Sequence, residues 1–308
     1  MTAAAANARN AYIGIACALL GSIGFSGKTI IIKLVYQYDV DVITLLALRM
    51  LIALPFFIAM AWWAGGGEPM SRRDWYAMAA LGFIGYYLGS YLDFAGLQYI
   101  SAGLGRLILY LYPTLVLLFS ALFLKQPIRP RHLLSLALSY GGIAIIFQHE
   151  TAFGDDLPRT LLGAALVFAG AVTYAIYLIA GSGIVQKIGS MRFTAYASIS
   201  ASCFVIAHFM VTHGPARLAV AHEVYWLTLL MAIVSTVLPL WFMAEGLRRI
   251  GANQTSLVAC IGPISTIALA HFFLGEVVTG YQLAGAALVL AGVMIISVKP
   301  RPSAPENQ

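Results

Sequence analysis

Long apolar runs separated by short polar segments dominate the pattern of the chain. A helix rises about 1.5 Å per residue, so about 20 apolar residues cross a hydrocarbon core about 30 Å thick. Ten runs reach about this length, and each predicts a membrane-spanning helix. Their expected limits are 11–33, 42–64, 75–97, 102–124, 132–149, 160–182, 193–213, 224–245, 252–274 and 280–298.

The segments between these runs carry residues typical of turns, as in Gly65 to Pro69 and Gly214-Pro215. The runs lack the alternation of apolar and polar positions that marks the strands of a transmembrane barrel. Of the 308 residues, 61% are apolar and 10% are charged, whereas about one quarter of an average soluble domain is charged. The pattern therefore predicts an all-α membrane protein with ten transmembrane helices.

Basic residues lie mainly on one side of this predicted layout. If the N-terminus is inside, only Lys33, Arg159 and Arg217 fall in outer segments, while most other Lys and Arg residues fall in inner ones. Short loops rich in Lys and Arg stay on the cytoplasmic side of a membrane. Both the N-terminus and the C-terminus are therefore predicted to be cytoplasmic.

The two halves of the chain resemble each other in sequence. Residues 96–146 align without gaps on residues 246–296, with 14 identities in 51 positions, and the alignment pairs Pro113 with Pro263. At an offset of 149, the first runs of each half also align two pairs of glycines, Gly14 with Gly163 and Gly21 with Gly170. Duplication explains this gap-free register better than shared apolar composition.

The duplication divides the chain into two repeats of five runs, residues 1–150 and residues 151–308. Five is an odd number, so the second repeat must cross the membrane in the opposite sense to the first. Inverted repeats recur in secondary transporters, where two equivalent halves expose one central site alternately to each side. The architecture therefore predicts a transporter.

The polar residues exclude several classes of function. The net charge of +6 comes without the basic face of a nucleic-acid-binding domain, so no nucleic-acid partner is expected. Cys17, Cys203 and Cys260 lie singly in apolar runs and lack the spacing of a disulfide or metal site. The segment from Ser22 to Thr29 misses the first glycine of a phosphate-binding loop and lies inside an apolar run. We predict no metal and no cofactor.

Four ionisable residues fall inside predicted spans of the first repeat: Lys28, Arg49, Asp93 and Arg106. A charge inside a bilayer costs about 2.5–3.5 kcal/mol on insertion scales and so indicates function. We predict that Lys28 or Arg106 binds a substrate carboxylate, and that Asp93 binds an ammonium group or titrates. The alternative is a structural network in which Asp93 only neutralises Lys28. Arg49 is interpreted as a structural or interfacial residue.

Tyrosines share helical faces with these ionisable groups. Tyr86 lies on the same side of its helix as Asp93, and Tyr110 lies on the same side as Arg106. Tyrosine supplies an apolar face with a polar tip, which suits a binding cavity. We expect aromatic residues of the second repeat to complete the cavity, namely Tyr174, Tyr177 and Trp241.

Two prolines and one glutamate are candidates for moving parts. Pro113 and Pro263 remove backbone donors, so each predicts a hinge or a static kink in its helix. Glu245 lies near the inner end of its span, where it either pairs with Arg248 or Arg249 or forms part of an inner gate.

Three further polar residues have simpler interpretations. His208 and His271 are solitary in apolar runs, and each is expected to form a hydrogen bond between helices rather than a proton relay. Glu276, together with Thr279, is expected to cap the last span.

Several motifs in order resemble one known family. They are Lys28 to Lys33, Leu48-Arg49, and the segment from Gly262-Pro263 through Leu274-Gly275-Glu276 to Gln282–Ala286. In their order and spacing, over nearly the whole chain, they are similar to the EamA family of the drug/metabolite transporter superfamily. The first repeat departs from the pattern, because Gln126 stands where the second has Glu276. This difference argues against an essential symmetric proton site there.

The resemblance implies a ten-helix carrier of bacterial inner (plasma) membrane type, with a central cavity between the repeats, that exports amino acids or related metabolites. We accordingly expect a secondary transporter that moves a small-molecule substrate by alternating access. The alternatives are an intramembrane enzyme or a channel that acts on a small solute. The chain lacks a GxSxG elbow and a histidine metal motif, which weighs against the enzyme. The substrate, the transport direction, the coupling ion and the oligomeric state stay open.

Overall fold

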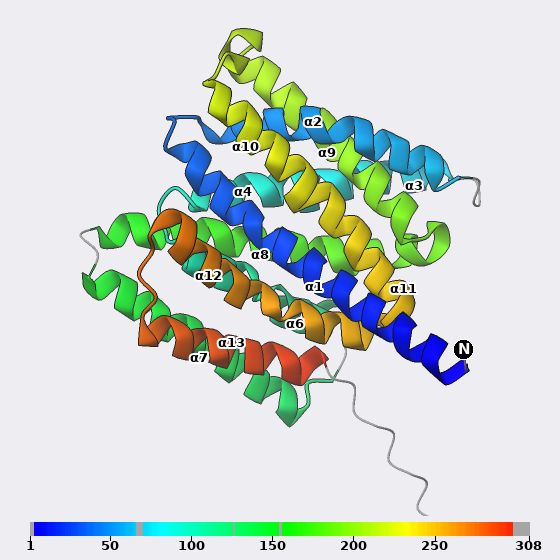
Figure 1. The fold of residues 1–308 in the computed structure, drawn as a ribbon, viewed down its shortest axis with the longest axis vertical. Helices are drawn as coiled ribbons and strands as arrows, with labels where there is room; N and C mark the ends of the chain where they lie inside the picture. The colour runs from blue at the N-terminus through cyan, green and yellow to red at the C-terminus, as the bar shows by residue number, and fades with distance from the viewer. Residues whose placement is uncertain (1–2, 66–69, 126, 154–155, 298–308) are drawn as a thin grey trace, which may run out of the picture.

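The computed structural model describes residues 3–65, 70–125, 127–153 and 156–297, and Figure 1 shows that this part of the chain is helical throughout. The first half contains α1 (Ala3–Tyr36), α2 (Val42–Trp63), α3 (Arg72–Leu81), the π-helical η1 (Gly82–Leu88), α4 (Gly89–Gly96), α5 (Ala102–Leu109), α6 (Tyr112–Leu124) and α7 (Pro130–Phe153). The second half contains α8 (Leu157–Ile188), α9 (Ser190–Thr212), the 3-10 turn η2 (Pro215–Leu218), α10 (His222–Ala232), the π-helical η3 (Ile233–Val237), α11 (Leu238–Ala259), α12 (Ile261–Leu274) and α13 (Gly280–Ser297).

Many of these helices are apolar enough to cross a membrane. Seven stretches of the described chain have the length and composition of spans: Ala11–Tyr36, Val42–Trp63, Ala102–Phe123, Pro130–Glu150, Leu157–Ile188, Met191–Thr212 and His222–Ile250. The apolar helices α12 and α13 are shorter, and α3, η1 and α4 form one continuous helical stretch. Each of the ten predicted runs thus corresponds to a helical stretch.

The helix bounds differ from the predicted limits where helices continue beyond their apolar part. The helix α8, for example, reaches Ile188 rather than residue 182. The fourth run is interrupted between α5 and α6, and the third contains wider π-helical turns. An apolar run indicates the membrane-embedded part of a helix, whereas caps and prolines decide where the helix begins, breaks and ends.

Contacts show that the chain reverses direction within α11, close to the predicted boundary between the eighth and ninth runs. Ile250 packs against Gly14, yet nine residues later the Ala259 carbonyl accepts a hydrogen bond from Ser22. A straight helix would carry Ala259 further from Ser22, because α1 and the start of α11 run antiparallel. Helical turns therefore continue around this bend.

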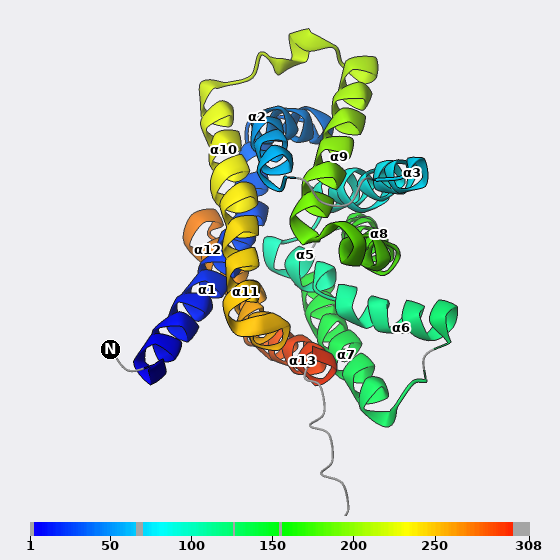
Figure 2. The ribbon, with the colours of Figure 1, turned by 90° about the vertical axis from the view of Figure 1, so that its right-hand side faces the viewer.

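The main packing pairs join elements that lie far apart in the sequence. α1 packs on α11 and α12, α8 packs on α4, α2 packs on α9, and α7 packs on α13. Figure 1 shows α7 and α13 side by side at the lower edge. In Figure 2, turned by 90°, α1, α10, α11 and α12 lie on one side of the molecule and α3, α6, α8 and α9 on the other.

Glycines allow the closest of these approaches, and the contacts repeat between the halves. A Cβ added to Gly14 of α1 would lie 2.6 Å from Ile250 Cγ2, and one added to Gly163 of α8 would lie 2.8 Å from Ile100 Cγ2. Gly163 aligns with Gly14, and Ile100 aligns with Ile250, at the offsets of the sequence repeat. The first helix of each half thus packs in the same way on an element of the other half.

A polar contact outside the apolar stretches joins the start of α3 to the end of α8. Ser71 caps α3 in a capping box with Asp74, and Lys187 Nζ lies 2.6 Å from Asp74 Oδ2. The hydrogen bond from Lys187, followed by those from Ser71, lowers the pKa of Asp74 to about 2. The carboxylate therefore stays ionised at neutral pH.

Candidate functional site

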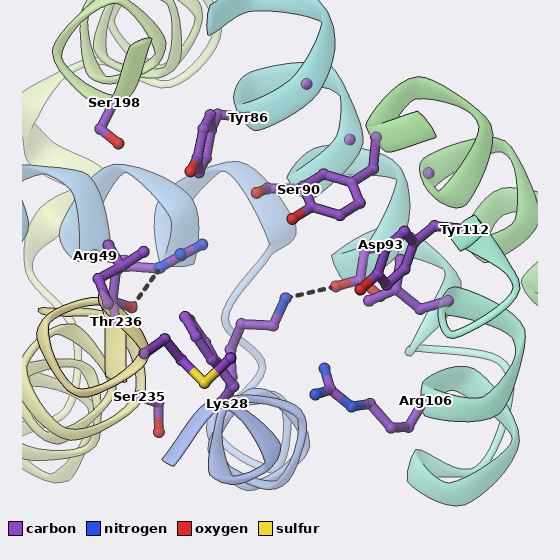
Figure 3. Close-up of a pocket in the computed structure, with 18 of the residues that line it drawn as sticks. Lys28, Arg49, Tyr86, Ser90, Asp93, Arg106, Tyr112, Ser198, Ser235 and Thr236 are labelled. Atoms are coloured by element: carbon purple, nitrogen blue, oxygen red, sulfur yellow. Dashed lines mark hydrogen bonds and ion pairs between the residues drawn. The ribbon is translucent and has the colours of Figure 1, made fainter. Parts of the chain in front are cut away.

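A cavity of about 290 Å³ lies where elements of both halves meet. Figure 3 shows that charged and hydroxyl-bearing side chains point into it from several helices. Its lining residues are Ser22, Phe25, Lys28, Arg49, Met50, Phe57, Gly85, Tyr86, Gly89, Ser90, Asp93, Arg106, Leu109, Tyr110, Tyr112, Gly170, Tyr174, Ser198, Ser235, Thr236, Leu240, Met243 and Ala259. The cavity is thus apolar in much of its wall but strongly charged at one end.

The ionisable residues that the sequence places in separate spans meet at this cavity. Lys28 of α1 and Asp93 of α4 form an ion pair, with 2.9 Å between Nζ and Oδ2. Their side chains are 15% and 6% exposed, so water screens this pair little. Lys28 therefore neutralises the charge of Asp93, which is the one carboxylate among the lining residues that the structure describes.

Arg49 of α2, which the sequence suggests is structural or interfacial, also lines the cavity. It is 6% exposed, and its Nε donates a long hydrogen bond of 3.4 Å to Thr236 Oγ1 of η3. Its Nη1 is buried and has no hydrogen-bond partner among the described residues. The Phe94 ring lies 5.6 Å from Arg49 Cζ and 5.6 Å from Lys28 Nζ. The position of an arginine within an apolar run was the signal for this role.

Arg106 of α5 approaches the cavity from the opposite side to Arg49, and Figure 3 shows its guanidinium pointing towards Lys28. Its Nε is buried and has no partner among the described residues. Its Nη2 lies 3.3 Å from the place that a Cβ at Gly262 would occupy, so the side chain reaches the second half. Two guanidinium groups thus present unused donors at one cavity.

The breaks before the two prolines shape the cavity wall. In an unbroken helix the Ala259 carbonyl would accept from the backbone nitrogen of residue 263, but Pro263 has no hydrogen there. The freed carbonyl instead accepts hydrogen bonds of 2.9 Å each from Ser22 Oγ and Tyr110 Oη. Pro113 follows the equivalent break between α5 and α6. Each proline therefore interrupts its helix beside the cavity, and any hinge motion there stays a prediction.

The predicted aromatic residues divide into three groups. Tyr86, Tyr110 and Tyr174 line the cavity as expected. Tyr177 lies behind the wall, where it is 4% exposed and contacts the ring of Tyr86 at a centroid distance of 5.1 Å. The prediction for Trp241 was wrong, because this side chain is 56% exposed and contacts Phe242. Its neighbour on the chain, Leu240, lines the cavity, and successive helical residues point about 100° apart.

Residues at equivalent positions of the two repeats line the cavity together. At the offset of 149 that aligns the first runs, three pairs of lining residues from the first three spans of each half correspond: Phe25 with Tyr174, Arg49 with Ser198, and Tyr86 with Ser235. Equivalent residues of a two-fold repeat converge only near the symmetry axis. Equivalent positions of the two duplicated halves therefore line one cavity.

Comparison with known proteins agrees with this internal duplication. Residues 12–148 and residues 161–298 each match the EamA-like transporter family. The chain belongs to this EamA family. It is therefore a multi-pass membrane transporter and not an enzyme, and the two matched segments correspond to two duplicated halves.

Related proteins support the same assignment. The uncharacterized transporter YcbK of Bacillus subtilis (strain 168) is 29% identical over 87% of each chain. An uncharacterized transporter of Archaeoglobus fulgidus is 24% identical over 89% of this chain and 94% of its own. A solved crystal structure of another protein, 18% identical, has a TM-score of 0.61 over 94% of this chain and 96% of that one. That likeness shows a shared fold.

Other polar residues of this EamA protein lie away from the cavity. Glu245 forms ion pairs with both Arg248 and Arg249, as one interpretation of the sequence predicts. The expected hydrogen bond between helices is confirmed for His208, whose Nδ1 lies 2.9 Å from the Tyr87 hydroxyl. For His271 it was wrong: Nδ1 contacts the Glu276 carbonyl just beyond the end of its own helix.

Glu276 has a different partner from the one predicted. Its Oε1 accepts a hydrogen bond of 2.9 Å from the backbone nitrogen of Ala102, at the start of α5 in the first half. Thr279 alone caps the last helix, through a hydrogen bond from the Gln282 backbone nitrogen. The positive end of the α5 dipole explains why a carboxylate occupies this place. Gln126, the counterpart of Glu276 in the repeat, lies outside the described residues.

A second cavity, of about 270 Å³, surrounds this glutamate. Glu150 of α7 also lines it and accepts a hydrogen bond from Ser101, the N-cap of α5. Two carboxylates from different halves therefore meet around the first turn of α5. The contact is a polar junction between the halves and is separate from the charged main cavity.

Proposed function

We propose that the chain crosses the inner (plasma) membrane ten times, as two inverted five-helix repeats formed by residues 1–150 and 151–308, with both termini cytoplasmic. The asymmetric distribution of Lys and Arg supports this orientation. The repeated contacts of Gly14 and Gly163 support a two-fold relation between the repeats. An odd number of spans per repeat then makes the two repeats antiparallel.

The function that this geometry supports best is secondary transport of a small organic solute by alternating access. The convergence of equivalent residues from both repeats on one charged cavity carries the proposal. If the repeats exchange their two conformations, a site on their axis opens to the other side without being rebuilt. Amino acids or related carboxylate-bearing metabolites are the proposed substrates.

In the proposed orientation, the cavity faces the cytoplasm. Its charged groups lie in the outer halves of their spans, whereas further lining residues such as Phe57 and Met243 lie towards the inner ends of theirs. The outer side is closed by contacts such as the hydrogen bond from Ala102 to Glu276, which joins the repeats. This junction is the proposed outer gate.

The ion pair changes the expected division of roles within the site. Asp93 is held by Lys28, so it is unavailable as a simple receptor for a substrate ammonium group. Arg106, with an unused donor, takes the role of carboxylate receptor. Charge-assisted hydrogen bonds from a guanidinium suit this role because its fork matches a carboxylate. Net export or import depends on the gradients of the solute and of any coupled ion.

Counterflow in proteoliposomes tests the carrier function. Vesicles loaded with an unlabelled solute should accumulate the same labelled solute transiently and saturably, across a panel of amino acids and organic acids. Ser90→Trp fills the cavity and is expected to abolish counterflow, while Ser182→Trp on the exposed face of α8 is the matched control. Conductive, non-saturable flux through the purified protein would indicate a channel and overturn the carrier proposal.

The topology has its own test in intact cells. A cysteine replacing Arg217 is expected to react with a membrane-impermeant maleimide from outside, whereas one replacing Arg73 reacts only after the membrane is opened. The background variant has Cys17, Cys203 and Cys260 replaced by alanine. Labelling of both positions from the same side would refute the proposed arrangement.

A further inference from the structure

The charges around the main cavity do not balance. Three basic side chains line it, those of Lys28, Arg49 and Arg106, against the single carboxylate of Asp93 among the described lining residues. Three positive charges and one negative charge leave a net charge of +2. The Lys28–Asp93 pair accounts for one charge of each sign, so the surplus belongs to the two arginines.

Part of this surplus lies where water cannot readily disperse it, because Arg49 is buried and Arg106 is half-buried. Arg49 is 6% exposed, and its Nη1 has no hydrogen-bond partner among the described residues. The Nε of Arg106 is likewise buried without a partner. Uncompensated charge within a membrane protein is costly, and guanidinium groups in such places act at substrate or ion sites. Each arginine therefore has one donor atom that no described residue satisfies, and an anionic ligand would offset its charge.

The two arginines approach from opposite sides of the cavity. In Figure 3, the Arg49 guanidinium lies beside Thr236, the Arg106 guanidinium lies across the cavity on the same side as Asp93, and the end of Lys28 lies between the two guanidinium groups. A single carboxylate of a zwitterion would satisfy one arginine and bring an ammonium group into a site that is already positive. A solute with an acidic group at each end satisfies both arginines.

We propose that the preferred substrates are organic dianions, chemically dicarboxylates, whose two carboxylates pair with Arg49 and Arg106 respectively. This inference rests on the proposed transport function and narrows its substrate class. The hydroxyl groups of Tyr86, Ser90 and Ser235, which line the cavity, are available to polar substituents between the two carboxylates. The planar fork of each arginine gives bidentate recognition that a lysine does not reproduce.

The test compares solutes that differ in charge but hardly in shape. Proteoliposomes exchange labelled succinate in the presence of unlabelled succinate, glutarate, adipate, succinamate or glutamine at pH 7. Succinamate replaces one carboxylate with an amide, and the chain-length series measures the spacing of the two acidic subsites. We expect at least one dicarboxylate to compete at least tenfold more strongly than succinamate, and glutamine to compete least.

Two arginine variants connect this selectivity to the structure. Arg49→Gln and Arg106→Gln are each expected to lower dicarboxylate exchange at least tenfold, while exchange of the monoanion changes less than threefold. Arg159→Gln, an exposed arginine at the start of α8, is the matched control and keeps wild-type selectivity. Stabilisation of the purified protein by the dicarboxylate against heat provides a binding measurement that does not depend on transport, and Arg49→Gln should remove it.

The outcomes separate this inference from the transport function. Saturable exchange of glutamine without competition by any dicarboxylate would leave the carrier function standing and overturn the dianion inference. Thermal stabilisation by a dicarboxylate without exchange would support the inference and count against the carrier. Equal competition by succinate and succinamate, or an unchanged preference in both arginine variants, would also overturn it. Exchange of a phosphate monoester alone would refute the two-ended geometry.

Discussion

Removal of either member of the Lys28–Asp93 pair leaves a charge without its partner in the protein interior. The two atoms are 2.9 Å apart, and the side chains are 15% and 6% exposed. Two unit charges at this distance attract by about 6 kcal/mol at an effective dielectric constant of about 20. Loss of one member of a buried pair costs about 3–5 kcal/mol, because the other member stays desolvated.

The two single variants differ in what they leave behind. Asp93→Asn leaves Lys28, Arg49 and Arg106 around the cavity with no carboxylate among its described lining residues. We expect this variant to lose stability near the upper end of the range, about 5 kcal/mol. Lys28→Met leaves Asp93 beside the remaining cations and is expected near the lower end, about 3 kcal/mol. The double variant, which removes both charges, should be more stable than Asp93→Asn alone.

The measurement is a double-mutant cycle on the free energy of unfolding in mixed micelles, titrated with a denaturing detergent. Interacting residues give coupling energies of about 0.5–3 kcal/mol, and this pair should lie at the upper end. Asp74 with Lys187, a more exposed pair, is the matched control and should couple more weakly. Additive effects of Lys28→Met and Asp93→Asn would show that each charge is solvated independently and would refute the buried-pair reasoning.

Three further predictions concern packing, pH and the junction between the halves. Gly142→Ala places a Cβ 2.5 Å from a backbone carbonyl of α13, so the variant should lose about 1–3 kcal/mol of stability in thermal unfolding. The adjacent Gly141→Ala has open space around its Cβ and should not be destabilised. The pKa of Asp74 is lower in the folded protein than its value of 3.8 in the unfolded chain, so its ionised form stabilises the fold above pH 3.8, and this contribution is lost as the pH falls towards about 2. The difference in melting temperature between the wild type and Asp74→Asn should therefore shrink between these two pH values. A constant difference would contradict the assignment. Glu276→Ala removes the acceptor of the Ala102 backbone nitrogen at the start of α5 and should cost about 1 kcal/mol in thermal unfolding. Glu223→Ala, in the first turn of α10, is the control. Equal losses would contradict a specific contact.

The sequence predicts the helical stretches well because lipid imposes one strong requirement, an apolar run of sufficient length. The meeting of Lys28 with Asp93 could also be anticipated, since an isolated charge in a membrane calls for a partner. The gap-free repeat predicted that one central site is shared by the two halves. These features depend on whether single residues are apolar or charged, and the sequence gives that directly.

Rotation of each helix about its own axis was the main quantity that the sequence left undetermined. A soluble helix reveals its buried side by its polar face, but the first turns of α11, from Leu238 to Ala244, are apolar on every side. Trp241 was therefore assigned to the cavity, although lipid accepts an exposed tryptophan at little cost. Partners between the halves posed a second difficulty: nothing near Glu276 in the sequence indicates that it caps α5, which begins 174 residues earlier.

The pairing of α1 with α11 has a consequence for how the protein is made. α1 ends at Tyr36 and α11 begins at Leu238, so the ribosome synthesises about 200 residues before the partner exists. At about 5–20 residues per second this takes on the order of 10–40 s. Throughout that interval the glycine-lined surface of α1 faces lipid or a temporary neighbour in the insertion machinery. Final assembly therefore waits for the second half, and a chain truncated before α11 lacks the surface that seats its own first helix.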